Sequence, residues 1–333
     1  MKIKHLLVAT LVLSAFTTST AIAQERVKLT ITNKDWEKPY PGFKVVGNLY
    51  YVGTYDLGCY LINTGAGLIL VNSGAPGSYP LIKASIEALG FKTSDIKVIT
   101  STHGHWDHMG ALPAAIDAIV GRRGRDSVTV HVNPDMFNER GVLLKSGVVF
   151  PAAKVPTPAQ MEARGARVIN NGNERLLVDG HFYYSGEIPR VTAFETGRQD
   201  HLCRRDNSEE WRPDPYLMDE RMLVANVRDL GLVVFSACSH AGIVNVCTEV
   251  RRLFPDMPIH AVMGGLHLGG VMEHLIPQTV EALGVFDVQH LITGHCTGWR
   301  ALHALAAAYG ERVSQSAVGT SYLFDSSAPP PSA

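Results

Sequence analysis

Four potential metal ligands crowd into six residues within the segment 101–110. They are His103, His105, Asp107 and His108. Imidazole nitrogens and carboxylate oxygens together suit Zn²⁺ and its first-row neighbours. His103 and His105 are two residues apart, so an extended backbone directs both rings to the same side. This spacing predicts a metal site rather than a solvated polar loop.

Three further histidines each lie just past a predicted strand: His240, His267 and His295. Open α/β sheets place functional groups at the carboxyl ends of their strands, so we expect all three to lie near the first segment. We predict that His240 and His295 are metal ligands. We predict that His267 is catalytic, through substrate binding or proton donation, with metal ligation as the alternative.

The elements that would position these residues alternate between strands and helices, which is typical of a layered α/β fold. Apolar runs predict strands at residues 27–32, 43–52, 59–63, 67–72, 96–100, 128–132, 174–178, 181–184, 191–194, 222–227, 231–236, 260–263, 288–293 and 318–324. Helical patterns predict helices at residues 79–89, 110–120, 242–254, 275–283 and 300–309.

Two segments interrupt this alternation. Residues 133–168 are polar and contain several prolines, and we predict a partly helical insertion that covers one side of the pocket. Residues 197–216 are rich in charge, and we predict a surface loop or lid there. Both segments are therefore expected to form walls of the substrate pocket.

The first 23 residues have the layout of a secretory signal peptide. Two lysines precede an apolar run at residues 6–16, and small residues occupy the −3 and −1 positions before residue 24. We therefore expect residues 1–23 to be removed and the protein to be exported, to the periplasm or the medium, with no membrane span after cleavage. One domain is predicted over residues 24–325, followed by a disordered tail at residues 326–333.

The composition of the 333 residues is that of an ordinary globular protein, with 46% hydrophobic and 18% charged residues and a net charge of −1. Such a chain lacks the basic surface of a nucleic-acid-binding protein, so we expect a small-molecule substrate and no nucleic-acid partner. Five cysteines cannot all pair within one chain. Cys238 and Cys296 lie within two residues of ligand candidates, and they either line the site or are buried, inert thiols.

The run His103-Gly-His-Trp-Asp-His108 matches the His-x-His-x-Asp-His signature of the metallo-β-lactamase superfamily, which the chain resembles over almost all of its mature length. The resemblance implies the αββα sandwich, an α/β fold of two mixed sheets with helices on the outer faces. The first half is similar to exported subclass B3 β-lactamases at residues 50–53 and 88–92 and in the metal loop. The second half is similar to the branch named for dihydropterin (ribofuranosyl)aminobenzene phosphate synthase, through motifs at residues 186–190, 238–245, 264–268 and 295–298.

The resemblance also implies a dinuclear metal site. One ion would be held by His103, His105 and His240, and the second by Asp107, His108 and His295. The expected metal is Zn²⁺, with Mn²⁺ or Fe as alternatives. Ions paired in this way lie about 3.5–4 Å apart and share a hydroxide. Asp107 is predicted to be catalytic as well as a ligand.

Three positions depart from the superfamily pattern. Asn72 stands where many members have an aspartate; it can orient its neighbours by hydrogen bonds but carries no charge. The aspartate that usually bridges the ions is missing, and residues 237–239 (Ala-Cys-Ser) stand in its neighbourhood. This predicts a weaker second site or a different metal there. Glu195 falls near the third-motif histidine of β-lactamases, and it is a ligand, a partner of Arg190 or a surface residue.

These features predict an exported metal-dependent hydrolase in which a metal-bound hydroxide attacks a small-molecule ester, lactone, amide or phosphoester. Metal binding lowers the pKa of water to about 7, so a nucleophile exists without a serine or cysteine. A B3-like metallo-β-lactamase that hydrolyses β-lactams is one alternative, and a metal-binding module without hydrolytic activity is another. Export argues against the pterin synthase activity itself, because that substrate would be cytosolic.

Overall fold

The computed structural model describes residues 34–177, 182–205, 208, 210–227 and 229–315. The chain divides into two units, Met1–Thr32 and Asn33–Ala333, and every element below belongs to the second. The predicted signal peptide, the predicted strands at 27–32 and 318–324 and the predicted tail all lie outside the described residues.

The first large sheet has seven strands in the order β1-β2-β3-β4-β5-β6-β9. Their bounds are β1 (Phe43–Val46), β2 (Leu49–Tyr51), β3 (Tyr60–Asn63), β4 (Leu68–Val71), β5 (Ile96–Thr100), β6 (Thr129–Val132) and β9 (Arg167–Asn170). The first four pair antiparallel, and β4, β5, β6 and β9 pair parallel. Every residue of β4 is buried, as expected for a strand that is covered on both faces.

The second large sheet has seven strands in the order β10-β11-β14-β15-β16-β17-β18. Their bounds are β10 (Arg175–Leu177), β11 (Phe182–Tyr184), β14 (Leu223–Val227), β15 (Gly231–Phe235), β16 (Ile259–Gly264), β17 (His290–Thr293) and β18 (Val313–Gln315). Pairing is antiparallel from β10 to β15 and parallel from β15 to β18. Each sheet is therefore mixed, with its parallel half leading to the site.

Helices cover the outer faces of the two sheets. Their bounds are α1 (Tyr79–Ala88), α2 (Trp106–Met109), α3 (Leu112–Arg123), α4 (Pro158–Ala163), α5 (Ile243–Leu253), α6 (Ile276–Leu283) and α7 (Trp299–Tyr309). Short 3-10 helices lie at Lys34–Glu37, Thr93–Asp95, Pro134–Phe137, Gly270–Leu275, Gly284–Phe286, His295–Thr297 and Gly310–Arg312. Within the described ranges, no helix combines the length and the apolar character that a membrane span needs.

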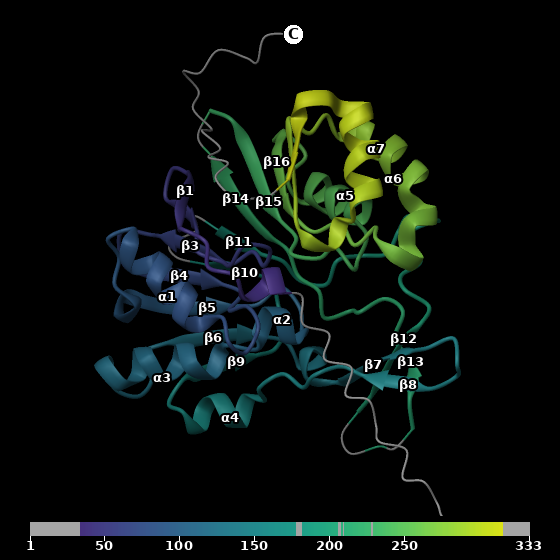
Figure 1. Cartoon of the computed structure of the whole chain (residues 1–333). Coiled ribbons are helices and arrows are strands. Elements are labelled where there is room, and N and C mark those ends of the chain that lie inside the picture. Colours follow the sequence, from purple (N-terminus) through teal and green to yellow (C-terminus); the bar gives the residue numbers. More distant parts are fainter. Residues whose placement is uncertain (1–33, 178–181, 206–207, 209, 228, 316–333) are drawn as a thin grey trace, which may run out of the picture. The chain divides into compact units, whose positions relative to one another are not determined.

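Three hydrophobic clusters fix the order of the layers. One joins the two sheets face to face, for example through Ile69 of β4 and Phe235 of β15. A second packs α1, α3 and α4 on the first sheet, and a third packs α5, α6 and α7 on the second. Figure 1 shows α1 and α3 on one side of the sheets and α5 to α7 on the other. The predicted αββα sandwich is confirmed.

The two segments that interrupt the alternation form a small third sheet. Its order is β13-β12-β7-β8, with β7 (Glu139–Leu143), β8 (Val149–Pro151), β12 (His201–Arg204) and β13 (Arg212–Pro213). The insertion at 133–168 supplies β7 and β8, and residues 197–216 supply β12 and β13 (Figure 1). The predictions of a partly helical insertion and of a loop therefore missed these strands. Their residues are largely half-buried or exposed, so the sequence shows little apolar periodicity.

Two strand predictions are wrong in detail. Residues 43–52 form two strands rather than one, because Gly47 adopts a positive φ of 50° and turns the chain between β1 and β2. Residues 191–194 form no strand. The backbone amides of Val191 and Thr192 instead donate to the side-chain Oδ1 of Asn245, at 2.9 Å each, so they need no neighbouring strand.

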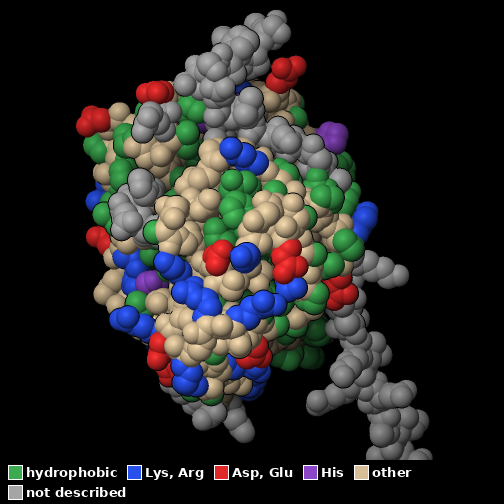
Figure 2. Space-filling view, turned by 90° about the vertical axis from the view of Figure 1, so that its left-hand side faces the viewer, with side chains coloured by type: hydrophobic (Ala, Val, Ile, Leu, Met, Phe, Trp, Pro, Cys, Tyr) green, Lys and Arg blue, Asp and Glu red, His purple; other side chains and the backbone are tan. Residues whose placement is uncertain are grey.

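The outer face of the first helical layer is charged. Figure 2 shows Lys and Arg side chains across this face, with Asp and Glu beside them and hydrophobic side chains between. Helix α1 contributes an ion pair between Lys83 and Glu87 at 3.0 Å, and α3 ends in Arg122 and Arg123. Basic side chains in the last turn of a helix interact favourably with the negative end of the helix dipole. The face carries both signs of charge, as expected for a chain of net charge −1.

Candidate metal centre

The predicted metal loop leaves the carboxyl end of β5 and runs into α2. The loop carries His103 and His105, and Asp107 lies in the first turn of α2. Gly104 approaches the backbone of Met136 so closely that a Cβ there would clash with the Met136 carbonyl. The loop is therefore packed tightly against the segment that follows β6, which fixes the direction of its side chains.

Asn72 positions this loop from the end of β4. It adopts a φ of 62°, a conformation that asparagine tolerates better than most residues. Its Oδ1 accepts a hydrogen bond from the backbone amide of Thr102 at 3.1 Å. Thr102 in turn places its hydroxyl 3.1 Å from Nδ1 of His103, which leaves Nε2 of that ring for a metal. Asn72 thus acts through hydrogen bonds, as its chemistry predicted.

Three histidines form the first group of metal donors. The structure brings His103, His105 and His240 together so that one nitrogen from each lies within 4.8 Å of the others. Their ring centroids are 4.7 to 4.9 Å apart. His240 reaches the group from the loop that follows β15. The two halves of the chain therefore complete one site, as the position of His240 after a strand predicted.

The second group of donors contains Asp107, His108 and His295. Asp107 Oδ2 lies 3.4 Å from Nε2 of His108 and 3.6 Å from Nε2 of His295. His295 follows β17, so it enters from the second sheet as predicted. All six predicted ligands thus lie in two neighbouring groups, joined by the contact of the His103 and His108 rings at 4.3 Å between centroids.

The donor groups fit metal ions. Nε2 of His103 and Nε2 of His240 are buried without a hydrogen-bond partner, a costly arrangement unless a ligand completes it. Burial holds the pKa of His103, His105 and His240 well below the ordinary value, so these rings stay neutral and keep a lone pair for a cation. Nitrogen donors with one carboxylate suit Zn²⁺ and related first-row ions.

His267 lies beside the first group rather than within it. Its ring centroid is 4.2 Å from that of His240, and its buried Nδ1 has no hydrogen-bond partner. The residue follows β16 and adopts a φ of 47°, which is unusual for a side chain of this size. It also lines the cavity in front of the donors. Its place at the cavity leaves the predicted catalytic role as a prediction. Metal ligation stays open as well, because His267, Cys238 and His240 form a further group of donors.

Cys238 contacts the second donor group and is also buried, so both features predicted for this thiol are present. Its Sγ lies 3.3 Å from Nε2 of His108 and 3.8 Å from Nε2 of His295. Cys296 directs its thiol toward the backbone carbonyl of Cys238, at 3.6 Å. Both cysteines are free, as are the other three.

Three consecutive residues that the sequence analysis overlooked tie the two metal loops together. Asp219 accepts hydrogen bonds from the Gly104 amide at 2.6 Å and from Arg140 at 2.9 Å. Glu220 accepts from the His240 amide at 2.9 Å. The amide of Arg221 donates to the Thr102 carbonyl at 2.7 Å. Asp219 and Glu220 are fully buried, and burial raises the pKa of Glu220 to about 7. Charged residues that precede an apolar strand were the only sequence signal.

Of the three roles predicted for Glu195, the structure shows an electrostatic interaction with Arg190. Its carboxylate caps the start of α5, accepting from the amides of Val244 at 2.9 Å and Asn245 at 2.7 Å. It is buried, and it belongs to none of the donor groups found among the described residues. A carboxylate at the start of a helix accepts hydrogen bonds from amides that have no partner within the helix. It also interacts favourably with the positive end of the helix dipole.

A cavity of about 180 Å³ opens in front of the donors. Trp36 and Trp106 form one wall, with ring centroids 5.6 Å apart. Arg198 and His201 come from the segment predicted as a lid. His201 was not among the predicted site residues. It is buried, with its ring centroid 6.0 Å from that of His105, and burial lowers its pKa to about 3. No spacing signal marked it, because β12 itself was not predicted.

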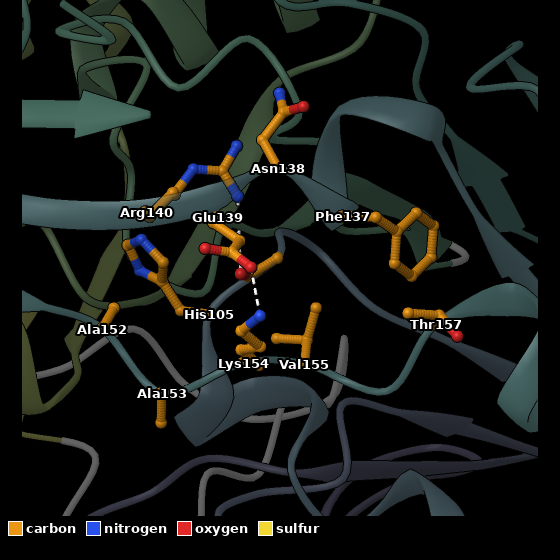
Figure 3. Close-up of a pocket in the computed structure, with 11 residues that line it drawn as sticks. His105, Phe137, Asn138, Glu139, Arg140, Ala152, Ala153, Lys154, Val155 and Thr157 are labelled. Carbon is orange, nitrogen blue, oxygen red and sulfur yellow. Dashed lines mark hydrogen bonds and ion pairs between the residues drawn. The ribbon is translucent and has the colours of Figure 1, made fainter. Parts of the chain in front are cut away.

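A second cavity of about 240 Å³ adjoins His105 on the side of the insertion. Figure 3 shows Glu139 and Lys154 facing each other within it, with Phe137 and Thr157 at its far side. Glu139 accepts hydrogen bonds from Lys154 and, at 2.6 Å, from Arg204. The predicted contribution of residues 133–168 to a pocket wall therefore agrees with the structure. The wall is an ion-paired, polar surface next to a metal donor.

Comparisons with known proteins agree with this geometry. The model of the metallo-β-lactamase superfamily matches residues 59–140, which include the metal loop. A crystal structure described as a metal-dependent hydrolase of the β-lactamase superfamily superimposes with a TM-score of 0.63, at 21% identity, over 80% of this chain and 90% of that chain. The chain has the metallo-β-lactamase fold. The family match includes the His-x-His-x-Asp-His motif, and the predicted metallo-β-lactamase fold is confirmed.

Two further proteins are similar to this chain. A curated relative from Methanocaldococcus jannaschii is named 7,8-dihydropterin-6-methyl-4-(β-D-ribofuranosyl)-aminobenzene-5′-phosphate synthase. It is 25% identical over 219 residues, 65% of this chain and 71% of the relative. A class B3 di-zinc metallo-β-lactamase from an Alaskan soil metagenome superimposes with a TM-score of 0.44 at 20% identity, over 80% of this chain and 83% of that chain.

Proposed function

We propose that this protein is an exported hydrolase that uses two metal ions to cleave a small-molecule ester, lactone, amide or phosphoester. One observation carries the proposal. Six donor side chains from both halves of the chain form two adjoining groups that border a cavity of about 180 Å³. Stability alone does not require such a cluster, since burying unpartnered imidazole nitrogens is unfavourable.

The six donors divide between the two ions as follows. His103, His105 and His240 would hold one ion, and Asp107, His108 and His295 would hold the other, with Zn²⁺ as the expected metal. When bound, such a pair supplies Lewis acidity and makes water nucleophilic at neutral pH. No residue of the chain then has to serve as the nucleophile.

The chain's own residues would supply positioning, proton transfer and a dry environment. His267 faces the cavity and has a free ring nitrogen, so it is placed to donate a proton to the leaving group. Trp36 and Trp106 exclude water from one wall and offer flat surfaces to a substrate. Arg198 adds a positive charge at the rim, held in place by two hydrogen bonds to Asp200 at 2.7 and 3.0 Å.

We do not propose the synthase activity of the Methanocaldococcus jannaschii relative for this chain. Residues 1–23 have the layout of a signal peptide, and a pterin precursor would be a cytosolic substrate. We propose that cleavage leaves a mature protein that begins near Gln24. N-terminal sequencing of the protein from the periplasm or the medium tests this, and uncleaved protein confined to the cytosol would contradict it.

A substrate panel tests the hydrolase proposal. Chromogenic esters, lactones, phosphoesters and a cephalosporin are offered to the purified zinc-loaded protein. We expect turnover of at least one of the first three classes, and its loss in His103→Ala. His303→Ala is a matched control, because His303 is exposed on α7 and should leave the rate unchanged.

Hydrolysis of the cephalosporin alone, abolished by His108→Ala, would favour the B3-like β-lactamase. Zinc binding without turnover on any substrate would favour the non-hydrolytic module.

A further inference from the structure

We propose that the thiolate of Cys238 bridges the two metal ions, in the place of the carboxylate that is missing from this chain. The inference rests on the proposed two-ion site and adds a seventh ligand to it. It also assigns a soft sulfur donor to a centre whose other donors are nitrogen and oxygen.

The distances to the second donor group support coordination. Cys238 Sγ lies 3.3 Å from Nε2 of His108 and 3.8 Å from Nε2 of His295. Two donors on one tetrahedral zinc ion, with bonds of about 2.3 Å to sulfur and 2.0–2.1 Å to nitrogen, lie about 3.5 Å apart. The two observed distances lie on either side of this value, so one ion could bind all three atoms.

The same sulfur also reaches the first donor group. Cys238 forms a group of mutually close donors with His103 and His108, and another with His240 and His267, in each case within 4.8 Å. His103 and His240 belong to the first ion, whereas His108 belongs to the second. The Nε2 atoms of His103 and His240 are buried without partners, so a ligand is expected on this side as well.

The turn that carries Cys238 is held rigidly. Ser239 adopts a φ of 53°, and its hydroxyl contacts Ser236 Oγ at 2.9 Å and donates to the Gly265 carbonyl at 2.7 Å. The Gly265 amide donates to the Ala237 carbonyl at 2.8 Å. Supporting hydrogen bonds of this kind fix a ligand before the ion arrives. Cys238 is itself buried, which restricts competition from water.

Binding replaces the S–H bond with bonds from sulfur to the ions, and the proton passes to solvent. The thiolate then carries the same single negative charge as the missing aspartate. Thiolate ligands favour Zn²⁺ and other soft or borderline ions over Mn²⁺ or Mg²⁺. A bridging thiolate would therefore favour Zn²⁺ over Mn²⁺, two metals that the sequence without the bridging aspartate left open.

Cobalt substitution tests this assignment without any activity measurement. Co²⁺ is added to the metal-free protein, and the near-ultraviolet band that arises from charge transfer between thiolate and Co²⁺ is recorded. We expect the band in the wild type and its loss in Cys238→Ser. Cys296→Ser should keep it, because Cys238 still supplies a thiolate. Cys296 shares a donor group with Cys238 and His295 but with none of the histidines of the first ion. Cys247→Ala, in the core of α5, is the matched control and should also keep the band.

Metal content provides the second measurement. Cys238→Asp restores a carboxylate and should hold two Co²⁺ ions without the band, which separates loss of sulfur from misfolding. Two bound Co²⁺ ions without the band in the wild type would overturn this inference alone. A band that survives in Cys238→Ser and disappears in Cys296→Ser would also overturn it. If the wild type binds no Co²⁺ or Zn²⁺, the proposed function fails together with the bridge.

Discussion

Asp219→Asn is the substitution that most directly probes how the metal loops are held in place. Asp219 is fully buried and accepts from the Gly104 amide at 2.6 Å and from Arg140 at 2.9 Å. Asparagine has one acceptor oxygen and an amide group that can only donate. Either the Gly104 amide or Arg140 must therefore face the amide group of the asparagine, which cannot accept a hydrogen bond. Arg140 also loses a negatively charged partner.

The size of the effect follows from what Arg140 retains. Its Nε still donates to Asp214 at 3.2 Å, and its guanidinium reaches the Asp135 carbonyl at 3.0 Å. Removing one partner of a buried ion pair costs about 3–5 kcal/mol when nothing replaces it. Because Asp214 compensates in part, we expect the free energy of unfolding to fall by about 3 kcal/mol.

Urea unfolding of the metal-free proteins measures this difference without a contribution from metal binding. Asp117→Asn is the matched control, because Asp117 and Arg164 form an ion pair whose side chains are 53% and 42% exposed. Exposed pairs contribute about 0–1 kcal/mol, so the control should change little. Equal effects of the two substitutions would refute the view that Asp219 anchors the loop. A loss of zinc affinity in Asp219→Asn but not in the control is also expected.

Three further predictions concern the scaffold. Glu195→Gln should lower the free energy of unfolding by about 1–2 kcal/mol, because one amide of α5 loses its acceptor, while zinc content stays unchanged; a fall in zinc content would instead identify Glu195 as a ligand. Gly264→Ala should lower it by at least about 3 kcal/mol, since Gly264 has a φ of 128° and an added Cβ would meet the Ser236 carbonyl; wild-type thermal stability in this variant would contradict that. Burial and the nearby Arg175 lower the pKa of His131 from 6.5 to about 4. Between these pH values His131 is protonated in the unfolded chain but not in the folded chain. The free energy of unfolding therefore falls as the pH drops from 6.5 to 4. His131→Gln should make this fall smaller, and an unchanged pH profile would disprove the assignment.

The layers and the metal donors were predictable because each has a local signal. Continuous apolar runs such as β4 and β15 indicate buried strands, and their ends mark one edge of each sheet. His240 and His295 were identified by their position after such strands. The motif at residues 103–108 needs no long-range information at all.

The supporting residues were not predictable because their roles depend on distant partners. Asp219 and Gly104 are 115 residues apart, and Glu195 contacts amides about 50 residues later in the chain. The role of a buried carboxylate depends on which backbone amides donate hydrogen bonds to it, and the sequence does not show which amides lie nearby. The strands that carry the cavity wall were missed for a related reason. His201 lies on a short, partly exposed strand whose partner β7 is also partly exposed, so neither shows a clear pattern.

The central claim is that two neighbouring donor groups bind two ions, and metal stoichiometry tests it most directly. Elemental analysis of the zinc-equilibrated protein should give two zinc ions per chain. His240→Ala removes a donor of the first group and His295→Ala removes one of the second, so each variant should retain about one. One zinc ion or fewer in the wild type, or two in both variants, would contradict the account.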